Sequence, residues 1–241
     1  MLTKKNNLFY INIITTLLLI VSQLNAQTIE GTCGLFFIPT AEMQKDATIT
    51  IGTNFVNKNL VSFSDYSQDA ITPYITFSFL PFVEFNIKIT RYVEKGVGDQ
   101  ALGDRTFSGR LRIIEESSTL PSIVIGCHDL LTVFGGVEAI HNNSLYIVAT
   151  KNFQLYNFLI SNISLTAGYG SDILQARTYN FVGLFGGVSI EFFRIMNLMN
   201  EYDGKRFNGG FRIKLFNNIS ILGGFLDYKH FSGGVAVSFQ L

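Results

Sequence analysis

The chain has 241 residues with a formal charge of zero at pH 7; 47% of them are hydrophobic and only 15% are charged. This length allows one large domain or one barrel, and the balanced charge gives no indication of a nucleic-acid partner. Glycine is plentiful, with 22 residues, and proline occurs only 4 times, which favours long strands with close backbone contacts over helices.

Residues 1–26 have the features of a cleaved secretory signal peptide. Lys4 and Lys5 form a basic start, Leu8–Val21 is an apolar core, and the stretch ends in a small-residue cleavage site, Leu-Asn-Ala. A single membrane anchor is the alternative, but the apolar core is short and contains polar residues. The mature chain is expected to begin at Gln27, and losing both lysines leaves a formal charge of about −2.

Residues 27–46 are predicted to form a lead-in that precedes the strands. Within them, Gly31–Ala41 is punctuated by glycine and proline. We expect an ordered arm without a ligand role, and in a barrel it would pack at the periplasmic mouth or plug the lumen.

After the lead-in, segments in which apolar and polar residues alternate indicate about twelve β-strands. In Phe82–Tyr92, for instance, Phe85 and Ile87 alternate with Glu84 and Lys88. The predicted strands are Ala47–Val56, Ile71–Phe79, Phe82–Tyr92, Arg105–Glu115, Pro121–Cys127, Asn143–Lys151, Asn157–Tyr169, Asn180–Ile190, Arg194–Tyr202, Arg206–Phe216, Ile219–Tyr228 and Phe231–Leu241.

The segment Arg105–Glu115 shows that the polar faces of these strands carry many charges. Its apolar side includes Leu111, and its polar side includes Arg110 and Arg112, with Glu116 just beyond. These are too many charges for the core side of a soluble sandwich, where each buried charge needs a partner. Either the charges face water around a protein core, or they line a lumen while the apolar side faces lipid.

The connections between the first eight strands alternate in length, as in an outer-membrane barrel with long external loops and short periplasmic turns. The long connections are Asn57–Ala70, Val93–Asp104, His128–Asn142 and Gly170–Tyr179. The short ones are Leu80–Pro81, Glu116–Leu120, Asn152–Tyr156 and Glu191–Phe193. After the signal peptide no apolar run is long enough for a membrane helix, so a membrane form must be a closed barrel. The sequence therefore predicts an all-β fold, an antiparallel transmembrane β-barrel of about twelve strands over residues 47–241.

If the apolar sides face lipid, the charged sides face a lumen. The predicted lipid-facing residues include Phe85, Ile87, Phe211, Ile213 and Val237. The candidate lumen-lining residues are Glu84, Lys88, Arg110, Arg112, Glu116, Arg212 and Lys214. These charges of both signs either brace the barrel into a closed form or line a polar path for sugar hydroxyls and acidic groups. Bracing is favoured, because about twelve strands make a narrower barrel than the roughly 16–18 strands of aqueous porins.

Five blocks of sequence, in order, resemble the YjbH-type exopolysaccharide-associated outer-membrane proteins. The blocks are Gly31–Ala41, Leu80–Tyr92, Phe107–Asp129, Tyr146–Phe153 and Glu201–Gly204, the last followed by Asn208 and Gly209. The resemblance implies a barrel of the Gram-negative outer membrane, linked to making or exporting an extracellular polysaccharide, with no catalytic residues to transfer. Its expected partners are outer-membrane lipid, the polysaccharide, other polysaccharide-export proteins and the barrel insertion machinery, which would read the ending Phe239–Leu241. Larger relatives resemble two barrel units, of which this chain covers one.

The two cysteines, Cys33 and Cys127, could pair in an oxidising periplasm or remain isolated thiols, because the sequence does not give their separation. Cys33 lies too far beyond the apolar core to carry the lipid anchor of lipoprotein relatives. Attachment to the membrane is therefore expected from the barrel itself.

Catalytic sets are not expected. His128 and His141 fall in one predicted external loop, and neither they nor Ser144 belong to a nucleophile-elbow motif. Glu201 and Asp203 could share a strand face, but Asp203 and the glycine after it are better explained as a turn. No cofactor or metal site is predicted. The predicted function is a non-enzymatic barrel in polysaccharide export or assembly; the alternatives are a general small-solute porin or structural barrel, a secreted glycan-binding β-sandwich and an outer-membrane hydrolase.

Overall fold

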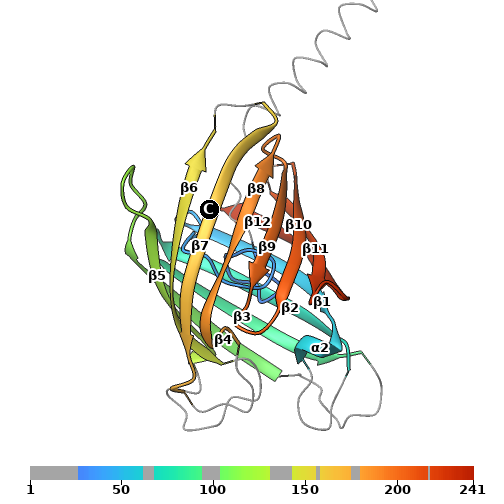
Figure 1. Ribbon diagram of the computed structural model, residues 1–241. Helices are drawn as coiled ribbons and strands as arrows, with labels where there is room; N and C mark the ends of the chain where they lie inside the picture. Colours follow the sequence, from blue (N-terminus) through green and yellow to red (C-terminus); the bar gives the residue numbers. More distant parts are fainter. Residues whose placement is uncertain are drawn as a thin grey trace, which may run out of the picture.

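The computed structural model describes residues 27–61, 68–93, 104–130, 143–155, 158–174, 180–216 and 218–241. The predicted signal peptide and His141 lie outside them. Within these ranges twelve antiparallel strands form a closed barrel, in which strands adjacent in the chain pair with each other and β1 pairs with β12 (Figure 1). The prediction of an all-β antiparallel barrel of about twelve strands is confirmed.

The strands and one short helix follow each other along the chain with these bounds. They are β1 (Thr48–Val56), α2 (Lys58–Val61), β2 (Ala70–Leu80), β3 (Val83–Tyr92), β4 (Asp104–Ile114), β5 (Ser122–His128), β6 (Ser144–Gln154), β7 (Ile160–Ser171), β8 (Gly183–Phe192), β9 (Met196–Tyr202), β10 (Phe207–Leu215), β11 (Ile219–Leu226) and β12 (His230–Gln240).

The two ends of the barrel differ in their connections. At the short-turn end, two residues join β2 to β3 and three residues join β8 to β9. Strand β1 starts there and β12 ends there, since Thr48 pairs with Gln240. The strand ends that the long connections β1–β2, β3–β4, β5–β6 and β7–β8 join all lie at the opposite end, which we call the long-loop end (Figure 1). One predicted strand start is wrong: Phe193 and Arg194 have positive φ values of 52° and 59° and form the turn before β9.

The barrel has a polar inside and an apolar outside, the reverse of a soluble protein. In β2, Thr72 and Thr76 point inward and are buried, whereas Ile71 and Ile75 point outward and are 48% and 45% exposed. The same alternation exposes one apolar face of the other strands. Its members include Ile51, Ile87, Leu111, Ile125, Ile147, Leu165, Leu198, Ile221 and Val235.

Exposed aromatic residues gather near both ends of this outer wall. Those near the short-turn end are Phe79, Phe82, Phe153, Phe158, Phe193, Phe216 and Phe239. Those near the long-loop end are Phe55, Tyr169, Phe207, Tyr228 and Phe231. An apolar band between two aromatic girdles is the outer surface of a barrel that sits in a bilayer.

Inside, large aromatic side chains lie flat against the wall over glycines. Tyr74 pairs with Gly52 on the next strand, and Tyr146 pairs with Gly126. A Cβ built on either glycine would come within 2.4 Å of the facing ring, so no other residue allows this close approach. The flat packing keeps these rings near the wall and leaves room in the middle of the barrel.

Candidate functional site

Residues 27–46, which we call the plug segment, occupy the interior of the barrel. Ile29, Phe36 and Ile38 in this segment are 0% exposed. The segment makes hydrogen bonds to side chains on strands that lie around the whole barrel, namely Asn54 on β1, Thr76 on β2, Glu84 on β3, Arg110 on β4, Thr150 on β6, Glu201 on β9 and Arg212 on β10. A segment that contacts opposite walls of a closed barrel lies in its lumen, where Figure 1 shows it in blue.

Glu201 on β9 holds the middle of the plug segment through backbone N–H groups. Its carboxylate accepts hydrogen bonds from the N–H groups of Phe36, Phe37 and Ile38 at 3.1, 2.9 and 3.3 Å. An irregular segment has no neighbouring strand to pair these N–H groups, and an unpaired buried N–H costs about 1–3 kcal/mol. One inward carboxylate therefore replaces a strand ladder at this point.

Arg212 on β10 provides the complementary donor. Its Nη2 donates to the carbonyl oxygens of Gln27, Gly34 and Leu35 at 2.9, 3.0 and 2.8 Å. The guanidinium is buried, and charge-assisted hydrogen bonds to several acceptors are what makes burial of a charge tolerable. Glu201 and Arg212 thus bind the N–H and the C=O groups of the same part of the plug.

A second charged group holds the plug on the opposite wall. Glu84 and Arg110 pair across β3 and β4 at 2.9 Å. Glu84 also accepts from the N–H of Cys33, and Arg110 donates to the carbonyl oxygen of Glu42. Nearby, Lys88 forms a buried ion pair with a residue of the plug itself, Glu30. Four predicted lumen residues, Glu84, Lys88, Arg110 and Arg212, therefore bind the plug segment.

The other three predicted residues lie toward the short-turn end. Arg112 sits at the rim, where it donates to the carbonyl oxygen of Pro81 at 2.6 Å. Glu116 accepts from both the backbone N–H and the side-chain amide of Asn152, each at 2.8 Å. Lys214 on β10 pairs with Glu191 on β8 at 2.9 Å.

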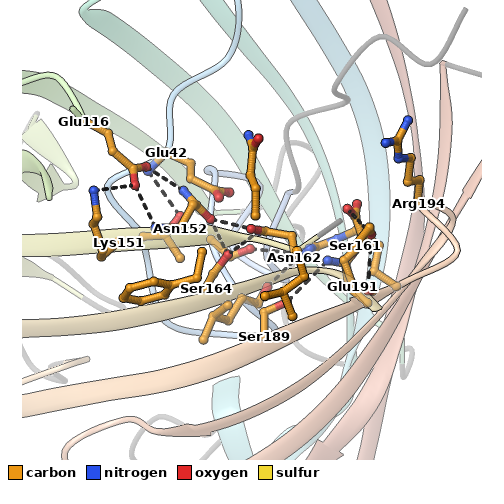
Figure 2. A pocket seen from close by; sticks show the side chains of 18 of the residues that line it. Glu42, Glu116, Lys151, Asn152, Ser161, Asn162, Ser164, Ser189, Glu191 and Arg194 are labelled. Atoms are coloured by element: carbon orange, nitrogen blue, oxygen red, sulfur yellow. Dashed lines mark hydrogen bonds and ion pairs between the residues drawn. The ribbon is translucent and has the colours of Figure 1, made fainter. Parts of the chain in front are cut away.

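A cavity of about 970 Å³ lies near the short-turn end of the barrel, between the plug segment and strands β6 to β10. Figure 2 shows hydroxyl, amide and charged side chains from several strands pointing into it, among them Asn152, Ser161, Asn162, Ser164, Ser189 and Glu191. Three of the predicted lumen residues, Glu116, Arg212 and Lys214, contribute to its wall. The volume is at the upper end of the range of about 300–1,000 Å³ that small-molecule sites occupy.

Several of the residues that make up the site were missed by the sequence analysis. Glu201 was named as part of a family block and as half of a carboxylate pair but not as a lumen residue, and Glu191, Asn162 and Asn197 were not singled out. The alternation of inward and outward side chains along each strand could have identified them, since their neighbours are apolar residues that face outward. This alternation does not reveal which inward residues meet, because that depends on the register between strands.

The structure brings together Glu201 and Asp203, the two carboxylates considered for catalysis, but both are bound to structural partners. Glu201 and Asp203 share a face, and both accept hydrogen bonds from the side-chain amide of Asn208. Asp203 also accepts from the N–H groups of Lys205 and Arg206, which fixes the turn before β10. Both carboxylates thus have structural partners.

The prediction that His128 is a solvated loop residue is wrong. His128 ends β5, is 2% exposed, and packs 5.3 Å from the ring of Phe181. The sequence pattern failed because the strand continues one residue beyond Cys127 with its side chain inward. Ser144 is its register partner on β6, but the hydrogen-bond contact of the imidazole is with Ser108, at 3.3 Å.

The two cysteines are free and buried. Cys33 belongs to the plug segment, and burial raises the pKa of its thiol well above the usual range. Among the described residues, no group of three or more His, Cys, Asp and Glu side chains is placed to hold a metal ion. No helix in that part of the chain is long and apolar enough to cross a membrane.

Comparisons with known proteins relate the chain to one family. A solved structure described as a KdgM porin aligns with a TM-score of 0.46 and 11% identity, over 80% of this chain and 99% of that one. A protein of Escherichia coli (strain K12) described as the uncharacterized lipoprotein YjbH is 24% identical over 211 residues, 77% of this chain. The chain spans 29% of the length of that relative. The family model described as "Exopolysaccharide biosynthesis protein YbjH" matches residues 27–221. The chain therefore belongs to the YjbH family of exopolysaccharide biosynthesis proteins.

Proposed function

We propose that this protein is a non-enzymatic barrel of the outer membrane that takes part in export or assembly of an extracellular polysaccharide. One observation carries the proposal: a barrel with an apolar outer wall belongs to a family described by exopolysaccharide biosynthesis. Residues 1–26 would direct the chain across the inner membrane, and the final strand would be read by the insertion machinery. The short-turn end would then face the periplasm.

The filled lumen supports an accessory or gated role over that of a general porin. A general porin needs a continuous aqueous path, whereas Glu201, Arg212 and the Glu84–Arg110 pair each bind the plug segment inside this barrel. An open path would require the plug to move. Other proteins of polysaccharide export are the expected partners, since they could supply both the polymer and the force that moves the plug.

Deletion of the gene in the bacterium that encodes it tests this role. We expect the deletion strain to lose surface polysaccharide, and a plasmid copy of the wild-type gene to restore it. The measurement is the amount of cell-bound and released polysaccharide per cell, together with the position of the protein after membrane fractionation. A protein found in the soluble periplasm, or unchanged polysaccharide in the deletion strain, would contradict the proposal.

A further inference from the structure

We infer that the cavity at the short-turn end is a binding site for a neutral, hydroxyl-rich ligand, namely an oligosaccharide of a few sugar units. The inference rests on the proposed function and deepens it, because it names the class of ligand and the place where the barrel would hold it.

The wall of the cavity contains a row of polar side chains on four adjacent strands. Asn162 on β7 pairs with Glu191 on β8, Glu191 pairs with Asn197 on β9, and Asn197 pairs with Arg212 on β10. Paired residues on one face of a sheet have Cβ atoms about 4.5–5.5 Å apart. The row is thus a continuous polar strip along the inner wall, with Ser164 and Ser189 lying beside it.

The row holds polar atoms that the protein leaves without a partner. The side-chain amide N–H groups of Asn162 donate to Asn152 and Ser164 at 3.1 and 3.0 Å, and that of Asn197 donates to Ser189 at 3.3 Å. Among the described residues, no group donates to the Oδ1 atoms of Asn162 or Asn197, and none accepts from Nε of Arg212. Buried polar groups almost always have partners, so unpaired ones call for a ligand or water.

Two acceptors and one donor in one strip match the chemistry of sugars. Each sugar hydroxyl donates one hydrogen bond and accepts others, so a chain of hydroxyls can satisfy both kinds of atom in sequence. At about 970 Å³ the cavity has room for an oligomer in place of one ring, by comparison with the range of about 300–1,000 Å³ for small-molecule sites.

The charges in the wall favour a neutral ligand. Glu116 faces Lys151 at 3.4 Å, and Glu191 faces Lys214 at 2.9 Å, so the central charges are already paired. The remaining ionised side chains of the lining are Glu42, Arg194 and Arg212. Glu42 and Arg194 have opposite signs, and Arg212 is already held by three carbonyl oxygens of the plug. An acidic sugar would have to compete with protein carboxylates for Lys151 and Lys214, whereas a neutral sugar uses the amides and hydroxyls without breaking an ion pair.

Binding of tetrasaccharides to the purified mature protein in detergent micelles tests the inference. The probes are neutral tetramers of glucose, mannose and N-acetylglucosamine, and an acidic tetramer of galacturonate, measured by calorimetry and by saturation-transfer NMR. We expect at least one neutral tetramer to bind about tenfold more tightly than the acidic one. The double variant Asn162→Ala and Asn197→Ala should weaken that binding about tenfold or more, since two hydrogen bonds are lost.

Asn180→Ala is the matched control. Like Asn162 and Asn197, Asn180 is an asparagine with a buried, unpaired side-chain atom, but it lies at the long-loop end. It should leave tetrasaccharide affinity unchanged. If the double variant does not assemble, Ser161→Leu is used instead, because a larger side chain at this cavity-lining position should obstruct the ligand while both asparagines of the row remain. This substitution also removes the hydrogen bond from the Ser161 hydroxyl to the Glu191 carboxylate.

The outcomes separate this inference from the proposed function. Failure of every neutral tetramer to bind, tighter binding of galacturonate, or equal losses in Asn180→Ala and the cavity variants would overturn the inference. Polysaccharide that stays unchanged in the deletion strain while the neutral tetramers bind as expected would overturn the proposed function and support the site. Loss of polysaccharide in the deletion strain without binding of any neutral tetramer would support the proposed function and overturn the site.

Discussion

Glu201→Ala is expected to release the plug segment and open the barrel. The substitution removes the acceptor of three backbone N–H groups, those of Phe36, Phe37 and Ile38. Leaving buried donors without a partner costs about 1–3 kcal/mol each, so the loss of one acceptor for three donors should weaken plug docking by about 3 kcal/mol or more. The measurement is single-channel conductance in a planar bilayer, where the wild type should be nearly silent and the variant should show frequent large openings.

Asp203→Ala is the control for this variant. Asp203 lies two residues further on the same face and bonds to Asn208 and to the following turn. Its loss should destabilise the turn and leave the channel closed. A second readout is proteolysis of residues 27–46, which should become cleavable in Glu201→Ala alone. A silent Glu201→Ala barrel with a protected plug would show that Glu201 does not hold the segment in place.

The second large effect is expected on the outer wall. Ile75 lies at the middle of β2, is 45% exposed, and pairs with Ile87 on the neighbouring strand. Arginine near the bilayer midplane of a barrel costs about 2–4 kcal/mol. We therefore expect Ile75→Arg to lower the free energy of unfolding in lipid vesicles by this amount, measured by urea titration.

The same substitution near the interface gives the control. Phe79→Arg changes an exposed residue at the short-turn end of the same strand, where an arginine costs only about 0–1 kcal/mol. If the outer wall faced water, both variants would fall within about 0.5 kcal/mol of the wild type. Equal and small effects at the two positions would contradict a bilayer around the barrel.

The strand count and the orientation of side chains could be predicted from sequence because both follow from a period of two. The alternation of Glu84 and Lys88 with Phe85 and Ile87 gave the inward and outward faces, and each of these charges lies inside. The alternation of long and short connections gave the two ends of the barrel. These signals are local, so a single sequence carries them.

The partners of the inward charges could not be predicted, because they depend on register and on the path of residues 27–46. The sequence analysis expected the charges to brace one wall against another. Instead Arg212 binds carbonyl oxygens of the plug segment, and Glu201 binds its N–H groups. The plug has turns and isolated bridges but no helix or strand, so no period in its sequence reveals which of its backbone groups face which strand.

The wall of the cavity could not be predicted from the sequence either, because it also depends on strand register. Asn162 and Asn197 are 35 positions apart in the chain, and only the pairing of each with Glu191 places them in one row. Arg112 shows that an inward position in the strand does not place a residue in the cavity. The alternation predicts that its side chain faces the lumen, but it lies at the rim beside Pro81 and is not part of the cavity wall.

If the apolar face of the strands meets lipid while the polar face encloses the plug, labels on the apolar face must be reached from the bilayer. We would place spin labels one at a time at Ile87, Ile213 and Val237, in a protein whose two cysteines are changed to alanine, and reconstitute each variant in vesicles. Collisions with oxygen dissolved in the bilayer should be frequent at these three positions, and collisions with a water-soluble nickel complex should be rare. Frequent collisions with the nickel complex and few with oxygen would mean that the outer wall faces water, and the membrane barrel would have to be abandoned.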